Sequence, residues 1–276
     1  MKWLHFILSH SIFIAVCAVA LCFQTALLLH VNLPVYLYAF IFFSTVGSYN
    51  FYWLLSGYSF SAKSLKIVAQ KYYSNIIVLL IAGAGFIFCF VKIPQLLPVV
   101  AIGAGLTLLY ALPLLPFKIF YVTRRAGIIK TFLLAFTWTF VTVYIPYYFV
   151  SAINSDLLIL LFVNRFLFML MLCIIFDARD TGVDKIRGLQ SLTTILKPNI
   201  VRGIMGIIFL IYIINGMVLR NYHHDTPQIT ALFITGVATA IVYYFSLKKQ
   251  GYFFYYFLVD GLMLFSAMCT YAAAIL

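Results

Sequence analysis

The stretch DARDTGVDKIRG, residues 177–188, follows an apolar run over residues 157–177 and holds three of the six acidic residues of the chain. Asp177, Asp180 and Asp184 stand at i, i+3 and i+7. At about 100° per helical residue, this spacing brings the three carboxylates within an arc of roughly 60°. The stretch therefore predicts a helix that carries three acidic side chains on one face, just beyond an apolar segment.

Composition places the whole chain in the membrane. Of its 276 residues, 65% are hydrophobic and 9% are charged, with a mean hydropathy of +1.10, whereas a soluble domain is about 45–50% apolar and about 25% charged. Because so apolar a chain leaves no room for a sizeable soluble domain, we expect a single transmembrane domain over residues 1–276. All six acidic residues are Asp and none is Glu, so a cluster of three is exceptional here.

Apolar windows long enough to span a bilayer, which takes about 20 helical residues, recur along the chain. Pro, Gly and charged residues separate them. There are nine, at roughly 10–30, 33–56, 74–92, 96–115, 129–150, 157–177, 202–220, 229–246 and 252–274. The predicted fold is an all-α integral membrane bundle of nine transmembrane helices.

Basic residues set the predicted orientation of the helices. Fifteen of the 18 Lys and Arg fall in connections on the side of the N-terminus, Lys92 and Arg220 fall on the other side, and Arg165 falls inside a window. Since cytoplasmic loops carry the excess of Lys and Arg, we expect a cytoplasmic N-terminus, an outer C-terminus and a cytoplasmic acidic cluster. These loops account for the net charge of +12 without nucleic-acid binding.

The acidic cluster has two interpretations. A solvated, salt-bridged helix end would use Arg179, Lys185 and Arg187 as local partners. The alternative is a Mg²⁺ site, since this cation binds through one or two carboxylates plus substrate phosphate, with basic neighbours on the outer oxygens of the anion. The absence of Glu favours the metal site, because a merely solvated helix end would use Glu freely.

These residues resemble the second aspartate-rich motif of the UbiA superfamily of intramembrane prenyltransferases. The spacing D-x-x-D-x-x-x-D is similar to that motif and is followed, as in the family, by Gly188, Thr193 and Thr194. A second stretch resembles the end of the family's fourth helix through Tyr110, Pro113 and Lys118. Nine helices and a cytoplasmic active side also fit the family, so the resemblance implies a UbiA-like fold.

The resemblance implies Mg²⁺-dependent transfer of a prenyl group from a prenyl diphosphate to a lipophilic acceptor, aromatic or lipid, at the cytoplasmic side. It assigns Mg²⁺ to Asp177, Asp180 and Asp184. Substrate binding is expected from Asn50, Lys118, Arg179 and Lys185. Two of these residues have an alternative role that needs no substrate. A lone transmembrane Asn, such as Asn50, commonly makes a helix-packing hydrogen bond, and Lys118 also fits the excess of basic residues in cytoplasmic loops.

The first motif of the family, N-D-x-x-D-x-x-x-D, lacks its acids here. The corresponding segment begins at Asn50, and Phe51, Leu54 and Tyr58 stand where carboxylates would be. Either one Mg²⁺ at the second motif suffices, with Lys63, Lys66 or Lys71 supplying lost positive charge, or the protein is a noncatalytic relative that binds an isoprenoid or lipid. A small transporter is a third hypothesis, disfavoured because nearly all polar residues lie at the inner edge.

Two further ionisable residues lie inside the windows. Arg165 should face the bundle interior or a wet cavity, and Asp260 is one conceivable partner. Asp260 follows Tyr255 and Tyr256 in a string that is also similar to UbiA-like proteins. For this string we expect a structural role in closing the bundle.

Overall fold

The computed structural model describes residues 2–61, 73–111, 127–150, 155–187, 191–222 and 226–275, with backbone alone for residues 2, 56–61, 111, 127–128 and 183–187. Every element of this part is helical. The longer α-helices are α2 (Ile12–Leu28), α3 (Val35–Ser61), α5 (Tyr73–Val91), α6 (Leu97–Ala111), α8 (Gly127–Thr139), α10 (Ser155–Arg187), α12 (Pro198–Val218), α13 (Thr226–Ser246) and α14 (Asp260–Ile275).

Shorter segments extend or connect these helices. They are α1 (Lys2–Ser9), α9 (Ile145–Val150), α11 (Leu192–Ile195), the 3-10 turns η1 (Pro94–Leu96) and η5 (Leu219–Tyr222), and the π-helical segments η4 (Phe140–Tyr144) and η6 (Phe254–Val259). The segment η4 joins α8 to α9, and η6 leads directly into α14, so each π segment lies within a longer helical run.

Each predicted window coincides with a helical segment, but the number of spans differs from the prediction. Within the described residues, six helices are long and apolar enough to cross a bilayer. A seventh span results if Trp3–Ser9 and Ile12–Leu28, bent by 66° at Ser11, count as one. The helix over Pro94–Tyr110 is apolar but shorter. The chain is thus a multi-pass integral membrane protein, and nine spans stays a prediction.

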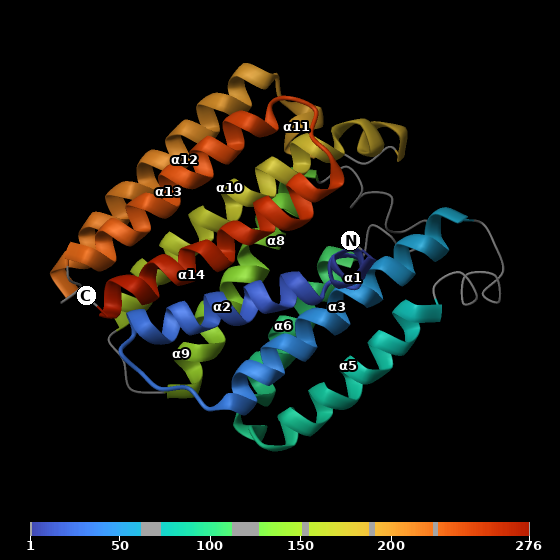
Figure 1. Cartoon of the computed structure of the whole chain (residues 1–276), viewed down its shortest axis with the longest axis horizontal. Helices are drawn as coiled ribbons and strands as arrows, with labels where there is room; N and C mark the ends of the chain where they lie inside the picture. The colour runs from blue at the N-terminus through green and yellow to red at the C-terminus, as the bar shows by residue number, and fades with distance from the viewer. Residues whose placement is uncertain are drawn as a thin grey trace.

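The long helices form a closed ring. Contacts run from α5 to α3, α2, α14, α13, α12, α10, α8 and α6, and α6 returns to α3. Figure 1 shows α12 and α13 along one edge of the bundle and α3 and α5 along the opposite edge. Helix α10 is the most enclosed, because residues 167–175 are all buried. An apolar helix that is buried on every side is typical of a central position.

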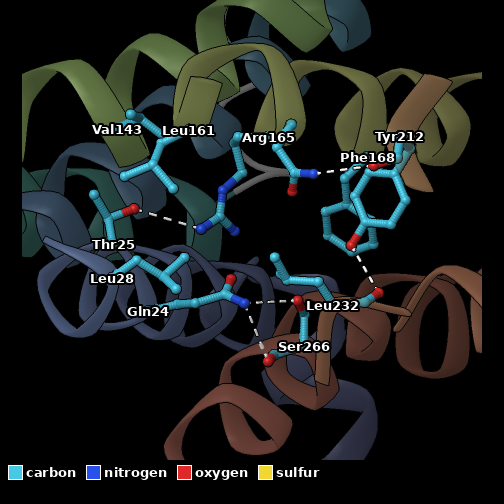
Figure 2. Close-up of a pocket in the computed structure, with 11 residues that line it drawn as sticks. Gln24, Thr25, Leu28, Val143, Leu161, Arg165, Phe168, Tyr212, Leu232 and Ser266 are labelled. Carbon is cyan, nitrogen blue, oxygen red and sulfur yellow. Dashed lines mark hydrogen bonds between the residues drawn. The ribbon is translucent and has the colours of Figure 1, made fainter. Parts of the chain in front are cut away.

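Arg165 lies within α10 and makes its hydrogen bonds to α2. Its Nη2 donates to the carbonyl oxygen of Leu21 at 3.2 Å and to Thr25 Oγ1 at 3.4 Å. The conceivable ion pair with Asp260 is absent from the described residues, where Arg165 forms no salt bridge. Figure 2 shows the guanidinium beside Thr25 and above Gln24, whose Nε2 donates to Ser266 Oγ at 2.9 Å. Polar side chains therefore join α2, α10 and α14.

Candidate functional site

A cavity of about 1250 Å³ opens between α1, α2, α3, α5, α6, α8, α10 and the segment that leads into α14. Ligand pockets for drug-sized molecules occupy about 300–1,000 Å³, so this cavity suits a larger ligand or two ligands together. Aromatic and aliphatic side chains form most of its wall, among them Phe40, Phe86, Trp138, Met169 and Phe176. The cavity is thus a largely apolar chamber on the side of α10 away from α12 and α13, which contribute no residue to its wall.

Asp177 lies on this cavity wall and is tied to two other segments. Its Oδ2 accepts a hydrogen bond from Thr131 Oγ1 of α8. Its backbone carbonyl accepts from Thr193 Oγ1 at 2.8 Å and from Thr181 Oγ1 at 3.0 Å. Thr193, which follows the aspartate stretch, is therefore in direct contact with Asp177: α11 binds its backbone carbonyl, and Thr131 of α8 binds its carboxylate.

Asp180 also lines the cavity, and Arg179 holds both of its oxygens. Arg179 Nε lies 2.6 Å from Asp180 Oδ1, and Nη2 lies 2.8 Å from Oδ2. Three aromatic rings surround the guanidinium, with its Cζ 4.9 Å from Phe176, 5.3 Å from Tyr255 and 4.9 Å from Tyr256. A cation over ring faces is stabilised by the ring quadrupole, so an aromatic cage and a carboxylate fix Arg179 together.

Three predicted site residues lie outside the described side chains. These are Asp184, Lys185 and Lys118. The structure places the backbone of residues 184 and 185 near the end of α10 and leaves the three-carboxylate site untested. Within the described part of the chain, no three His, Cys, Asp or Glu side chains form a group that could hold a metal. Two carboxylates at one end of a cavity nevertheless meet the usual donor need of Mg²⁺, which takes one or two together with phosphate.

Asn50 does not form part of the cavity wall. Its side chain is fully buried, and its Nδ2 donates to the carbonyl oxygens of His10 at 3.0 Å and Val46 at 2.9 Å. Its Oδ1 accepts from Asn75 Nδ2 at 2.9 Å. These hydrogen bonds fit the packing alternative, because Asn50 joins α3 to the end of α1 and to α5, and the expected substrate contact stays a prediction.

Aromatic residues occupy the place of the missing first motif. Phe51, Tyr52 and Trp53 all line the cavity. Tyr52 stacks on Tyr110 with ring centroids 5.4 Å apart, and Lys130 Nζ lies 5.6 Å from the centroid of the same Tyr110 ring. The sequence pattern had marked Tyr110, and the structure adds a cationic neighbour from α8.

Lys130 and Asp260 are the functional candidates that sequence reasoning missed. Both line the cavity, and Asp260 is only 4% exposed. Asp260 lines the chamber that Asp177 and Asp180 also line, and its expected role in closing the bundle stays a prediction. The available signal was an ionisable residue within or beside an apolar window, which by default marks a functional site in a membrane protein.

The fold is shared with solved membrane proteins, although the sequence is not. No protein-family model matches the chain, and no curated protein matches it. The structure is similar to that of a UbiA homologue from Aeropyrum pernix K1, with a TM-score of 0.67 and 12% identity, covering 97% of this chain and 98% of the other.

A digeranylgeranylglyceryl phosphate synthase gives a second likeness, with a TM-score of 0.58 and 13% identity over 100% of this chain and 99% of the other. At such low identities the likeness establishes the fold. The bundle is therefore UbiA-like, as the aspartate stretch predicted.

Proposed function

We propose that this chain is a UbiA superfamily member that transfers a prenyl group from a prenyl diphosphate to a lipophilic acceptor, at the cytoplasmic side of the membrane. One observation carries the proposal: a chamber of about 1250 Å³ combines aromatic walls with Asp177, Arg179, Asp180 and Lys130. An amphiphile with a long apolar chain and an anionic head matches such a chamber. A prenyl diphosphate has this chemistry.

The apolar and the charged parts of the chamber have different tasks. The aromatic wall would hold the prenyl chain, exclude water and stabilise positive charge at the reacting carbon through ring faces. Lys130 and Arg179 would bind the diphosphate oxygens through charge-assisted hydrogen bonds, with Lys118 and Lys185 as further candidates from the sequence. Exclusion of water strengthens each of these electrostatic interactions.

Mg²⁺ is the cofactor that the carboxylates suit. Asp177 and Asp180 would hold it, together with Asp184 and the oxygens of the diphosphate. When bound, the ion would neutralise negative charge on the departing diphosphate. Because Arg179 donates to both oxygens of Asp180, an ion bound at Asp180 would compete with Arg179 for this carboxylate, and a displaced guanidinium would be available to the diphosphate.

A noncatalytic isoprenoid-binding or lipid-binding protein is the second candidate. The observation that favours it is the loss of the first acidic motif, where Phe51, Leu54 and Tyr58 stand in place of carboxylates. The chamber has no second acidic cluster in the described residues. Such a protein would use the same chamber and the same basic residues, and would bind the prenyl diphosphate without turnover.

A transfer assay distinguishes the two candidates. Purified protein is incubated with Mg²⁺, radiolabelled prenyl diphosphates of several lengths and a panel of aromatic and lipid acceptors. Labelled product that depends on Mg²⁺ and disappears in Asp180→Asn supports the enzyme. Asp156→Asn, the same substitution at the opposite end of α10, is the matched control. Binding without product across the panel supports the noncatalytic protein, and no binding contradicts both candidates.

A further inference from the structure

We propose that Asp260 accepts the proton that the prenyl acceptor loses when its new bond to the prenyl carbon forms. The inference rests on the proposed transfer function. It adds a catalytic residue on α14, outside the aspartate stretch.

Asp260 is a buried acidic residue on the chamber wall, with no hydrogen-bonding partner among the described residues. It is 4% exposed and lines the chamber. Across the described residues it accepts no hydrogen bond and forms no ion pair. A carboxylate inside a membrane protein is costly unless it is paired, so its partner is expected to come from a ligand in the chamber. That partner must be a hydrogen-bond donor.

Asp260 lines the same chamber as Asp177 and Asp180 but comes from a different helix. Cys173 of α10 lies on the chamber wall as well, and both Asp177 and Asp260 act on it electrostatically. With the diphosphate at Asp177 and Asp180, the first carbon of the prenyl chain and the acceptor would meet in the chamber that Asp260 lines.

The electrostatic surroundings leave Asp260 available as a base. The titratable and charged groups that act on it from the neighbouring elements are Cys17, Tyr49, Cys173, Arg179, Tyr252 and Tyr256. Arg179 is the cation among them; it acts on Asp260 electrostatically, while its salt bridge within the described residues is to Asp180.

The local backbone positions this side chain. Asp260 directly follows the π-helical segment η6, and π segments inside α-helices are rare and frequently occur at functional sites. The same segment supplies Tyr255 and Tyr256 to the cage around Arg179. A single irregular stretch thus contributes to the cation cage and orients the carboxylate.

The proposed step is chemically balanced. The bond between the first prenyl carbon and the diphosphate oxygen breaks, and its electron pair leaves with diphosphate. An electron pair of the acceptor forms the new bond to that carbon. The proton of the acceptor passes to the Asp260 carboxylate, which returns it to solvent or to the released diphosphate. No oxidant or reductant is needed.

The test compares Asp260→Asn and Asp260→Glu with the wild-type protein in the transfer assay, with Asp156→Asn as the matched control. General acid–base catalysis contributes about 10²–10⁴-fold. We therefore expect Asp260→Asn to lower kcat for transfer by at least about 100-fold while binding of the prenyl diphosphate is retained. Asp260→Glu should restore part of the rate. Wild-type transfer should fall at acid pH, as the base becomes protonated, and Asp260→Asn should lose this limb.

Each other outcome contradicts the inference in its own way. Wild-type transfer rates in Asp260→Asn overturn the role of Asp260 and leave the proposed function standing. Loss of prenyl diphosphate binding in Asp260→Asn also overturns it, because Asp260 would then hold the donor. No transfer by the wild-type protein overturns both proposals. If Asp260→Asn does not fold, the wild-type profile decides: an acid limb on kcat but not on donor binding is expected, and a flat profile overturns the inference.

Discussion

Arg179 binds the carboxylate of its sequence neighbour Asp180 through two parallel hydrogen bonds, with Nε to Oδ1 at 2.6 Å and Nη2 to Oδ2 at 2.8 Å. The planar guanidinium matches a carboxylate in this bidentate geometry. Adjacent residues on a helix point about 100° apart, so Arg179 must fold back to reach Asp180. The aromatic cage of Phe176, Tyr255 and Tyr256 holds it in that position.

Removal of this guanidinium should strengthen metal binding. In Arg179→Gln, Asp180 loses a competing cation, so we expect the Kd for Mn²⁺, used as a paramagnetic substitute for Mg²⁺, to fall up to fivefold. The Asp180 side chain is 40% exposed, and an exposed ion pair contributes up to about 1 kcal/mol. This energy sets the fivefold limit on the change in Kd. Electron paramagnetic resonance titration measures the binding. Arg220→Gln is the control, and weaker Mn²⁺ binding in Arg179→Gln would contradict competition at Asp180.

The hydrogen bond from Thr131 to Asp177 should be needed for metal-dependent activity. Thr131→Val keeps the side-chain shape and removes the hydroxyl that donates to Asp177 Oδ2. Removal of a group that orients a metal ligand typically lowers metal affinity or activity about 10–100-fold. We therefore expect about a tenfold loss in kcat/KM for transfer.

The matched control for Thr131→Val is Thr137→Val. Thr137 lies on the same helix and lines the same chamber, but its hydroxyl donates to the carbonyl oxygen of Leu133 at 2.7 Å. The control should keep nearly full activity. Equal losses in the two variants would assign the effect to packing of α8 rather than to Asp177.

Hydropathy was sufficient to locate the helices, because a helix in a bilayer must present apolar side chains over about 20 residues. It could not predict the bend at Ser11, which has a left-handed φ of 62°, or the count of spans. The spacing of Asp177 and Asp180 placed both on one wall because helical periodicity is local. The hydrogen-bonding partner of Asn50 could not be predicted, since the carbonyl group of His10 lies 40 residues away in the sequence.

Asp260 shows the limit of sequence reasoning about the site. Asp260 lies 83 positions after Asp177 in the sequence, so helical periodicity cannot relate the two residues. The contacts of α14 with α2 and with α13 bring Asp260 to the chamber. The chemical signal, a carboxylate in an apolar window, was present in the sequence. The sequence did not show which way the Asp260 side chain points, because this depends on how all the helices pack together.

Substitution of Arg165 tests whether a buried cation stabilises the helix bundle. The guanidinium is 6% exposed and donates to Leu21 and Thr25 without a described acidic partner. Arg165→Met keeps similar volume and removes a charge that costs about 2.5–3.5 kcal/mol at a membrane centre. We expect the Tm in detergent to stay level or rise in this variant.

Arg165→Ala is the comparison, since it removes the charge and leaves a cavity. Truncation of a long buried side chain to Ala typically costs about 2–5 kcal/mol, so its Tm should fall. Thermal unfolding followed by tryptophan fluorescence measures both variants. A similar fall in Arg165→Met and Arg165→Ala would show that the two hydrogen bonds stabilise the bundle more than the packed volume does.

Gly236 of α13 should be intolerant of a methyl group, because side chains of α12 lie directly against it. A Cβ at this position would lie 2.9 Å from Tyr212 Cε1 and 3.2 Å from Ile213 Cδ1. Tyr212 cannot easily yield, since its ring is 1% exposed and its hydroxyl donates to the carbonyl oxygen of Leu232 at 3.1 Å. Overpacking costs about 1–3 kcal/mol, so Gly236→Ala should lower the Tm in a detergent unfolding scan.

Gly203→Ala on α12, where nothing lies within 4 Å of the new Cβ, should be neutral or slightly stabilising through helix propensity. Equal Tm values in the two variants would mean that Tyr212 moves aside and that the close approach of α12 and α13 does not depend on glycine.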